Sequence, residues 1–537
     1  MEKNILKYKN AVFYLIVILI IVIGLYLRID FFLFDVPMWW DEISLSFSIL
    51  NQDLFDVFVN IEANQKAPVL FVFLSYLITL IGGISNHTIR FIPFLSGIMV
   101  PFVTLVLSFK FFHSKIPVIF CLLLISFNPM LICYSNEFKP YSSDVLIFLL
   151  VILFYDKVNF ENISLRKIFL VSFILFLVCN LSFPAIFSLF AIVTMQIFKT
   201  QKLKNPVSQY FILSSELSVF SFFKGKTLKN ILISVTSRVF KKKYIKAMLL
   251  YLGIISAGLY SRWVFRNIIN YEISEENWQT GFLNFSFDSL FNLFDSYYRY
   301  INVDFTIGLL FLFSGIVILI LERNKYAFCM LLCFIFVCIA SILKIYPIYE
   351  RVALYLFPMF VLFMAKPLDI YLENGNIDNK IKSFILSCLM LFSFLYSMFP
   401  FVNVFDKQQI VPMDSYAIRY NETNGIHKFF DSYKLGETVT STGKMYDYIK
   451  YYNKIGKTDT DININCFDSY YNDEFYSKLN QSIEDNVNWI IFDQINENRE
   501  KLETIMKNTN VYTKFYENEI LIYKLNITSE QKFTGSP

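Results

Sequence analysis

The sequence is 537 residues long, and 55% of them are hydrophobic, 19% aromatic and only 17% charged. Soluble domains average roughly a quarter charged residues, so this composition excludes a purely soluble protein and indicates that most of the chain lies in lipid. The net charge of +4 is small and the basic residues lie beside apolar segments, which argues against nucleic acid as a partner. The chain is predicted to be an α-helical polytopic membrane protein.

Apolar segments of about the 20 residues that a helix needs to cross a bilayer recur up to residue 400. The first is too long for the core of a signal peptide and is expected to be retained as a span. The segment 67–83 begins with Ala67-Pro68 and ends at Gly82-Gly83, which makes it the weakest candidate. The segments are 11–29, 67–83, 90–111, 116–134, 142–155, 167–181, 184–198, 247–265, 304–321, 326–343, 352–365 and 383–400.

The distribution of Lys and Arg decides how the segment 67–83 is placed, because loops rich in these residues stay in the cytoplasm. If 67–83 lies along the surface, the basic loop 199–246 falls inside. If it spans, every later loop inverts and that basic loop falls outside. We therefore predict about eleven transmembrane helices, with the N-terminus inside and everything after residue 400 outside.

Composition divides the chain into two predicted domains. Residues 1–400 contain the spans, a first outer loop at 31–89 with two juxtamembrane helices, and the basic cytoplasmic loop at 199–246. Residues 401–537 alternate short β-prone runs with helical patterns, which predicts a small extracytoplasmic α/β domain. The β-prone runs are 437–442, 489–493 and 520–525, and the helical patterns are 445–452 and 497–507.

Cysteine and histidine give no sign of a disulfide framework or a metal site. Of the eight Cys, only Cys466 lies in a hydrophilic stretch, so no structural disulfide is predicted. The three His are scattered along the chain without the spacing of metal ligands.

The first outer loop carries two adjacent carboxylates, Asp41 and Glu42, directly after Trp39-Trp40. Apolar residues recur at helical spacing from Asp41 onward, which predicts a juxtamembrane helix that opens with the two acids. They are candidates for chemistry at the membrane surface. The alternative is that they only cap the helix and interact with the positive end of its dipole.

Two further outward junctions carry charges at the level of the membrane. Glu137 and Lys139 lie in the short second outer loop, where a charge is expensive and tends to be functional. Arg351 begins a later span beside Tyr349, and an arginine there can bind a phosphate headgroup in a bidentate manner. The alternatives are a snorkelling ion pair for the first junction and an interfacial anchor for the second.

Taken together, these loops place carboxylates and cations at one membrane face under a hydrophilic domain. A transferase that uses a lipid-phosphate donor needs such a set. A carboxylate takes the proton of the acceptor hydroxyl as it attacks, and the cations stabilise the charge that grows on the departing phosphate.

The order of these motifs resembles the GT-C superfamily of integral membrane glycosyltransferases. The chain is most similar to the bacterial branch related to protein O-mannosyltransferases and to the aminoarabinose transferase of lipid A, over roughly residues 10–365. The resemblance implies a GT-C-like fold with two surface helices in the first outer loop. The motifs are WWDE at 39–42, AP at 67–68, Arg90 with Pro93, YSNEFKPY at 134–141 and YERVALYLFP at 349–358.

The resemblance also implies roles for individual residues. Asp41 matches the presumed catalytic base, with Glu42 as the second member of the pair, and Glu137 matches the acid of the second outer loop. Arg351 matches a basic position that faces the donor phosphate, and Lys139 stands where relatives usually have Arg. These two residues and Tyr349 are expected to bind the donor phosphate. Relatives often have Glu or His before the proline at 68, where this chain has Gln65, Lys66 and Ala67. No metal site is therefore predicted, and participation of a divalent cation is left open.

The function expected from the sequence is that of an inverting glycosyltransferase. It would move one sugar from a polyprenyl-phosphate donor to an acceptor hydroxyl on a cell-envelope glycan, lipid or protein. The protein would lie in the cytoplasmic (inner) membrane, among membrane lipid, with its active site facing the outside or the periplasm. The alternative is a transporter, flippase or assembly protein for lipid-linked saccharides, although its charges lie at the outer boundary and not at mid-membrane depth.

Overall fold

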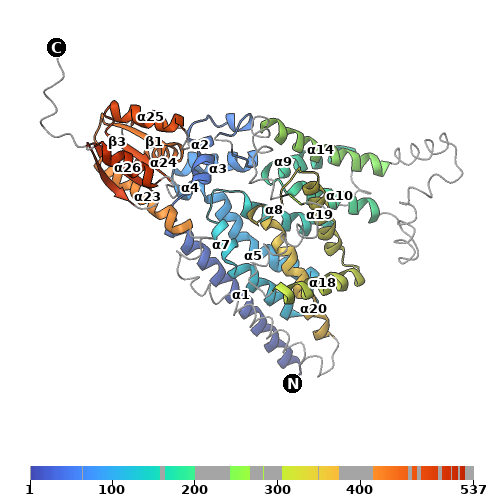
Figure 1. Cartoon of the computed structure of the whole chain (residues 1–537). Helices are drawn as coiled ribbons and strands as arrows, with labels where there is room; N and C mark the ends of the chain where they lie inside the picture. The colour runs from blue at the N-terminus through green and yellow to red at the C-terminus, as the bar shows by residue number, and fades with distance from the viewer. Residues whose placement is uncertain are drawn as a thin grey trace, which may run out of the picture.

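Figure 1 shows the computed structural model of the chain, in which helices fill the region up to Glu373 and a mixed α/β region follows at one end. Residues 200–241 of the predicted basic loop and the predicted span 383–400 lie outside the described residues. The structure describes residues 2–62, 65–157, 164–199, 242–265, 282–283, 305–348, 350–373, 415–457, 462–467, 473–493, 499–509, 511–517 and 520–525.

Long apolar helices form the body of the molecule, and short helices lie in the connections between them. Helix α1 runs from the N-terminus towards the α/β region (Figure 1). The helices up to Glu373 are α1 (Glu2–Phe34), α2 (Trp40–Leu50), η1 (Asp56–Phe58), α3 (Val69–Gly82), α4 (Asn86–Ile89), α5 (Phe91–Phe111), α6 (Lys115–Phe127), α7 (Pro129–Tyr134), α8 (Tyr141–Leu153), η2 (Phe154–Lys157), α9 (Leu165–Leu181), α10 (Ala185–Lys199), α14 (Lys242–Val264), α18 (Phe305–Leu321), α19 (Lys325–Ile342), η3 (Glu350–Leu356) and α20 (Phe357–Glu373).

Within the described part of the chain, five helical segments are long and apolar enough to cross a membrane. Shorter apolar helices accompany them, and α3 is one of these with 14 residues. The chain is thus a multi-pass helical membrane protein. Three features stay predictions: the total of about eleven spans, the surface position of α3, and the topology with the N-terminus inside and the C-terminal region outside. The five segments are Asn10–Phe34, Phe91–Phe111, Ile245–Val264, Lys325–Ile342 and Arg351–Asp369.

The predicted span 116–134 is broken into α6 and α7 at Asn128-Pro129. Proline lacks the N–H that would continue α6, and it fits the first turn of a new helix, where Asn128 supplies the cap. The break exposes carbonyl groups in the last turn of α6. Buried Arg28 of α1 donates hydrogen bonds of 2.7 and 3.0 Å to two of them. The carbonyl groups at these positions are therefore hydrogen-bonded in spite of the break, and the chain turns towards the second outer loop.

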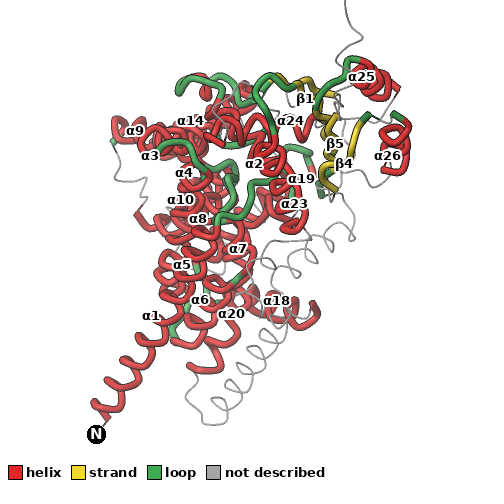
Figure 2. The backbone as a smooth tube through the Cα atoms, turned by 90° about the vertical axis from the view of Figure 1, so that its left-hand side faces the viewer, coloured by secondary structure: helices red, strands yellow, loops and turns green. Residues whose placement is uncertain are grey.

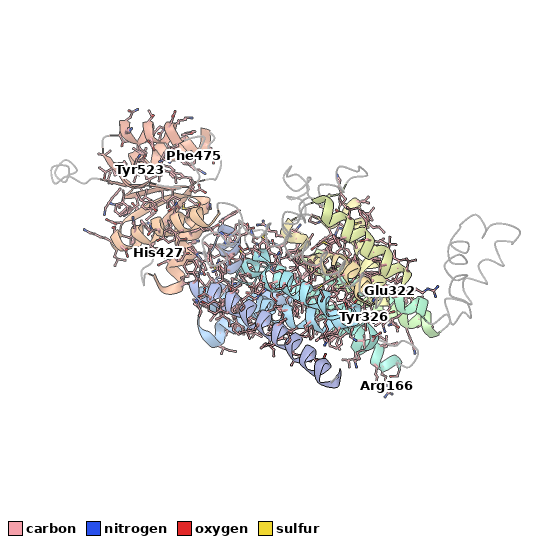
Figure 3. All side chains as sticks on the ribbon, turned by 90° about the horizontal axis from the view of Figure 1, so that it is seen from below. Arg166, Glu322, Tyr326, His427, Phe475 and Tyr523 are labelled. Atoms are coloured by element: carbon pink, nitrogen blue, oxygen red, sulfur yellow. The ribbon has the colours of Figure 1, made fainter. Side chains whose placement is uncertain are left out.

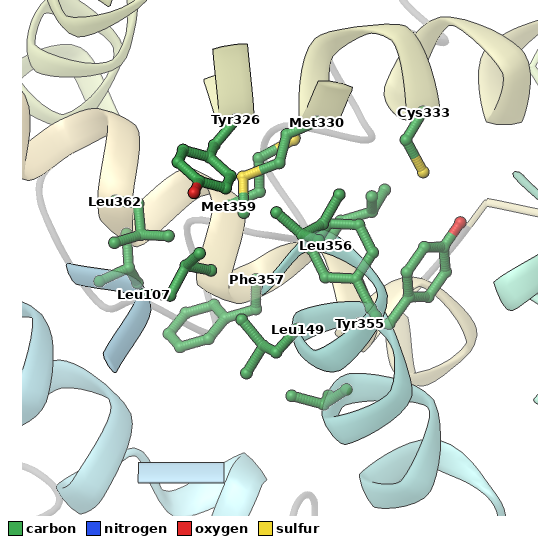
Figure 4. Close-up of a cluster of buried hydrophobic side chains, with 14 of the residues drawn as sticks. Leu107, Leu149, Tyr326, Met330, Cys333, Tyr355, Leu356, Phe357, Met359 and Leu362 are labelled. Atoms are coloured by element: carbon green, nitrogen blue, oxygen red, sulfur yellow. The ribbon is translucent and has the colours of Figure 1, made fainter. Parts of the chain in front are cut away.

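The helices pack closely enough that small residues are required at some crossings. A Cβ atom on Gly315 of α18 would lie 1.8 Å from the carbonyl oxygen of Phe363 in α20, so only glycine allows this approach. Figure 4 shows part of the buried core, where Leu107 of α5, Leu149 of α8 and Leu362 of α20 come together.

At the far end of the bundle, an ion-paired cluster joins α20 to Glu322 in the turn between α18 and α19. The buried ammonium group of Lys366 contacts Asp369 at 2.8 Å and Glu322 at 2.7 Å. Figure 3 shows Glu322 and Tyr326 on the helical body, well away from His427, Phe475 and Tyr523 in the α/β region. This cluster therefore belongs to the end of the molecule opposite the outer loops.

The α/β region is built on a five-stranded mixed sheet in the order β2-β1-β3-β5-β4. Figure 2 shows strands β1, β5 and β4 of this sheet. Strands β2, β1 and β3 are parallel, whereas β5 runs antiparallel to both β3 and β4. All three predicted β-prone runs and both predicted helical patterns are confirmed as elements of this region. Its elements are α23 (Ser415–Ser432), β1 (Thr438–Thr442), α24 (Gly443–Tyr452), η5 (Asn453–Lys457), β2 (Asn463–Phe467), α25 (Asp473–Glu484), β3 (Trp489–Phe492), α26 (Arg499–Asn508), β4 (Tyr512–Glu517) and β5 (Leu521–Leu525).

The α/β region packs directly on the first outer loop. Helix α24 contacts α2, and buried residues of both belong to one hydrophobic cluster that also includes Trp489 of the sheet. Two hydrogen bonds join the same surfaces, from Trp40 Nε1 to Asp447 at 2.9 Å and from the Tyr451 hydroxyl to Asn86 at 2.6 Å. The region is therefore fixed over the loops that carry the predicted site residues.

Candidate functional site

Residues from three separate loops meet at Asp41, as the sequence predicts. The Asp41 carboxylate oxygen Oδ2 lies 3.3 Å from Arg351 Nη2 and 3.7 Å from Lys139 Nζ. Both cations approach this same oxygen, so Oδ1 has no cationic partner among the residues that the structure describes. The side chain of Asp41 is 20% exposed and that of Arg351 is 26% exposed, which leaves this cluster accessible from outside the protein.

The neighbouring Glu42 is completely buried and fully paired. Its two oxygens accept hydrogen bonds of 2.8 and 2.7 Å from Nε and Nη2 of Arg90, a bidentate ion pair. The backbone N–H of Phe138 donates a further bond of 2.7 Å to Oε1. Glu42 therefore ties the start of α2 to the start of α5 and to the second outer loop, and it has no oxygen left for a substrate.

The local sequence explains why these loops come together. Glu42 lies one residue after Asp41 in the first turn of α2, so fixing Glu42 also fixes the direction of Asp41. On the other side, a Cβ atom on Gly97 of α5 would lie 2.2 Å from the side chain of Ser135, so glycine allows the second outer loop to lie against α5. The Gln65 side chain then accepts a hydrogen bond of 2.7 Å from Lys139 and orients its ammonium group.

A cation that sequence reasoning missed comes from the α/β region. Arg419 of α23 donates a hydrogen bond of 2.9 Å from Nη2 to Glu137 Oε1, and both side chains are buried. The guanidinium carbon of Arg419 lies 5.1 Å from the centre of the Trp39 ring, and that of Arg351 lies 4.7 Å from the same ring. The site thus draws on the C-terminal region as well as on the outer loops.

The environment changes the pKa values of the cations in opposite directions. Burial lowers the pKa of Lys139 from 10.5, and the nearby Asp41 only partly opposes this. Burial also lowers the pKa of Arg419, but Glu137 and Glu42 outweigh it and the net shift is upward. Arg419 therefore stays charged throughout the physiological range, whereas Lys139 loses its charge at a lower pH than a solvated lysine.

The predicted site residues are only partly brought together. Asp41, Lys139 and Arg351 form one cluster, and Glu137 lies in a second cluster with Arg419. Tyr349 lies outside the described residues. Among the described residues, no group of three or more His, Cys, Asp or Glu side chains is arranged to hold a metal ion. Each carboxylate at the site is instead paired with Lys or Arg, and such a donor set does not fit a divalent cation.

Comparisons with known proteins locate the similarity in the structure and not in the sequence. No protein-family model matches the sequence, and no curated protein matches it significantly. The structure is similar to that of ArnT from Cupriavidus metallidurans in the apo state, with a TM-score of 0.52 and 8% identity over 96% of this chain and 98% of that one. The same protein bound to undecaprenyl phosphate matches with a TM-score of 0.52 and 9% identity over the same shares.

A weaker match is the oligosaccharyltransferase of Archaeoglobus fulgidus in complex with Zn and sulfate. It has a TM-score of 0.47 and 11% identity, and covers 94% of this chain and 73% of that one. At this level of identity the ArnT structures establish a shared fold. They confirm the GT-C-like fold that the order of the motifs implies.

Proposed function

We propose that this chain is an inverting glycosyltransferase that uses a polyprenyl-phosphate-linked sugar as donor. The acceptor is a hydroxyl group of a cell-envelope glycan, lipid or protein. The observation that carries the proposal is the cluster of Asp41 with Lys139 and Arg351, a partly exposed carboxylate held between two cations. The fold shared with ArnT, which has been solved with undecaprenyl phosphate bound, supports the same donor class.

In this proposal the cations and the carboxylate act on opposite sides of the reacting carbon. The acceptor oxygen forms a bond to the anomeric carbon as the bond from that carbon to the phosphate oxygen breaks. The phosphate leaves with the electron pair, and Arg351 and Lys139 stabilise the charge that it gains. Asp41 accepts the proton of the acceptor hydroxyl, and attack from the side opposite the phosphate inverts the anomeric configuration.

The ion pairs also suggest how the base becomes available. Arg351 and Lys139 both contact Oδ2 of Asp41. A donor phosphate carries charge and several acceptor oxygens, so it competes with Asp41 for these two cations. Donor binding would then release the carboxylate from its partners at the moment when the acceptor needs a base.

The remaining predicted residues take supporting roles. Glu42, predicted as a member of the catalytic pair, is proposed to position Asp41, because both of its oxygens are already bound by Arg90 and Phe138. Glu137 would orient the donor or acceptor, and Tyr349 would bind the donor phosphate. No step in this mechanism uses a metal ion.

The proposed setting is the cytoplasmic membrane, with the N-terminus inside and the site on the outer or periplasmic face. The α/β region would then be extracytoplasmic, as the positive-inside distribution predicts. A donor dissolved in the bilayer would bring its phosphate to the level of the outer loops.

The proposal is tested in proteoliposomes that contain a polyprenyl-phosphate donor with an isotopically labelled sugar. Cell-envelope extract supplies acceptors, and the label is followed into glycan, lipid and protein fractions by mass spectrometry. We expect covalent transfer of the label to one of these fractions. Movement of intact donor across the bilayer without any covalent transfer would contradict the proposal and favour the flippase alternative.

The lowered pKa of Lys139 predicts a pH dependence of donor affinity. Lys139 is positive below its pKa and neutral above it, so its attraction for the phosphate is present at low pH and lost as pH rises through that pKa. We expect donor affinity to fall at a lower pH than the ordinary lysine value of 10.5 would give. The measurement is the Kd for the donor across the pH range 7 to about 10.

Two lysine-to-arginine variants separate the contributions of Lys139 and Lys66 to the pH dependence of donor affinity. Lys139→Arg should remove the decline, because arginine keeps its charge throughout this range. Lys66→Arg is the control, since burial lowers the pKa of Lys66 to about 8 but the residue is not part of the Asp41 cluster. A decline that persists in Lys139→Arg and disappears in Lys66→Arg would show that Lys139 does not bind the phosphate.

A further inference from the structure

The Glu137–Arg419 pair leaves buried polar atoms without partners. Glu137 Oε2 and Arg419 Nε make no hydrogen bond with any described residue, although each belongs to a side chain that is more than nine-tenths buried. The indole Nε1 of Trp39, the ring that Arg419 contacts, is also buried and unpaired in the described part of the protein. Leaving such an atom unpaired is costly, so a partner from outside the chain is expected here.

The unpaired atoms lie beside one another. Glu137 Oε2 shares its carbon with Oε1, and Arg419 Nε shares its carbon with Nη2, and these two partners are 2.9 Å apart. Together with Trp39 Nε1, they offer two donors and one acceptor around one location. Hydroxyl groups both donate and accept, so neighbouring hydroxyls on one ligand can satisfy all three atoms.

Charge separates this location from the Asp41 cluster. Arg419 is neutralised by Glu137, so the pair carries no net charge and offers a second phosphate little attraction. The Asp41 cluster has two cations for one carboxylate and does favour an anion. A neutral ligand rich in hydroxyls is the better match for the Glu137–Arg419 pair.

The two locations share one aromatic ring. Arg351 and Arg419 both contact the Trp39 ring, and their guanidinium carbons lie no more than about 10 Å apart, the sum of their distances to its centre. A phosphate held by Arg351 therefore lies close enough for the group attached to it to reach Arg419. In a polyprenyl-phosphate sugar, the phosphate carries a polyprenyl chain and a sugar, and the sugar is the group with hydroxyls that can bond to Arg419.

We propose that Glu137, Arg419 and Trp39 form the subsite for the donor sugar, in which the α/β region contributes Arg419 to substrate recognition. This inference rests on the proposed function, because it takes the Asp41 cluster as the phosphate subsite. The sugar hydroxyls bond to Arg419 Nε, Trp39 Nε1 and Glu137 Oε2. The C-terminal region is thus required for selection of the donor as well as for covering the site.

The test compares two lipids that differ only by the sugar. The Kd values for a polyprenyl-phosphate sugar and for bare polyprenyl phosphate are measured with the full-length protein in nanodiscs. Arg419→Met should weaken binding of the sugar-bearing lipid about tenfold or more, because hydrogen bonds to a charged group are lost. Binding of bare polyprenyl phosphate should change by less than about twofold, since Arg351 and Lys139 are intact.

Two further variants show whether the loss of affinity comes from the proposed subsite or from a general disturbance of the fold. Glu137→Gln keeps the shape of the side chain but removes its charge, and it should show the same selective loss for the sugar-bearing lipid. Arg499→Met is the matched control, because Arg499 pairs with Glu503 on α26 of the same region. It should change neither affinity. Thermal unfolding of each variant checks that the fold is retained.

The possible outcomes distinguish this inference from the proposed function. No loss of either affinity in Arg419→Met would overturn the sugar subsite while leaving the phosphate subsite intact. Equal loss of both affinities would also overturn the sugar subsite, because Arg419 would then contribute to phosphate binding. If wild-type protein binds neither lipid, the proposed function fails and the sugar subsite fails with it. A selective loss of the sugar-bearing lipid in both Arg419→Met and Glu137→Gln would establish the subsite.

Discussion

Asp41→Asn is expected to lower kcat for sugar transfer by about 10²- to 10⁴-fold, the range in which a general base contributes to catalysis. Asparagine has nearly the same shape but cannot take the proton of the acceptor hydroxyl. Because Asp41 pairs with Arg351 and Lys139, its neutralisation also frees both cations. Donor affinity should therefore be unchanged or higher in this variant while transfer is nearly lost.

The measurement combines steady-state transfer rates with donor Kd values for purified protein in nanodiscs. Asp53→Asn is the matched control, because Asp53 is an exposed carboxylate in the same outer loop and belongs to neither cluster. It should retain full activity. Full activity in Asp41→Asn would remove the proposed base, and a loss of donor binding in that variant would contradict the competition between Asp41 and the phosphate.

The second large effect concerns stability. Arg90→Met should lower the free energy of unfolding by about 3–5 kcal/mol, because it leaves the buried carboxylate of Glu42 without its cation. Glu42→Gln should lower the free energy of unfolding by a smaller amount. Its amide oxygen can still accept from the Phe138 N–H, and Arg90 keeps the Asp35 carboxylate at 3.6 Å. The measurement is denaturant-induced unfolding in mixed micelles.

The double variant Glu42→Gln with Arg90→Met decides whether the charge pair is the cause. With both charges removed, no buried charge is left unpaired, so much of the stability lost in Arg90→Met should return. If the two single effects simply add, the loss comes from packing and not from an uncompensated charge. The Glu42–Arg90 ion pair would then contribute less to the position of Asp41 than the structure indicates.

Much of the helical architecture could be predicted from the sequence, since apolar segments of membrane-spanning length are a strong local signal. The break of the segment 116–134 was missed although Asn128-Pro129 marks it, because hydropathy alone does not register where a helix ends. In the α/β region, the strands rich in apolar or β-branched residues were predicted correctly. The edge strands β2 and β4 were not, because polar residues such as Asn463 and Lys514 weaken their pattern.

The residues of the candidate site likewise divide into those that the sequence identifies and one that it does not. Asp41, Glu137, Lys139 and Arg351 were identified because a charge at the membrane boundary is conspicuous in an apolar sequence. Arg419 lies in a polar helix of a hydrophilic region, where an arginine gives no local signal. Its contact with Glu137 joins residues 282 positions apart and depends on how the α/β region packs on the outer loops.

The most direct test of the central claim is the release of bare polyprenyl phosphate. Wild-type protein and Asp41→Asn are incubated side by side with a panel of polyprenyl-phosphate sugars and cell-envelope extract, and the lipid products are measured by mass spectrometry. Release of polyprenyl phosphate from one donor by the wild type, and a rate at least about 100-fold lower with Asp41→Asn, is the predicted result. Equal release by both proteins, or no release from any donor, would contradict the account.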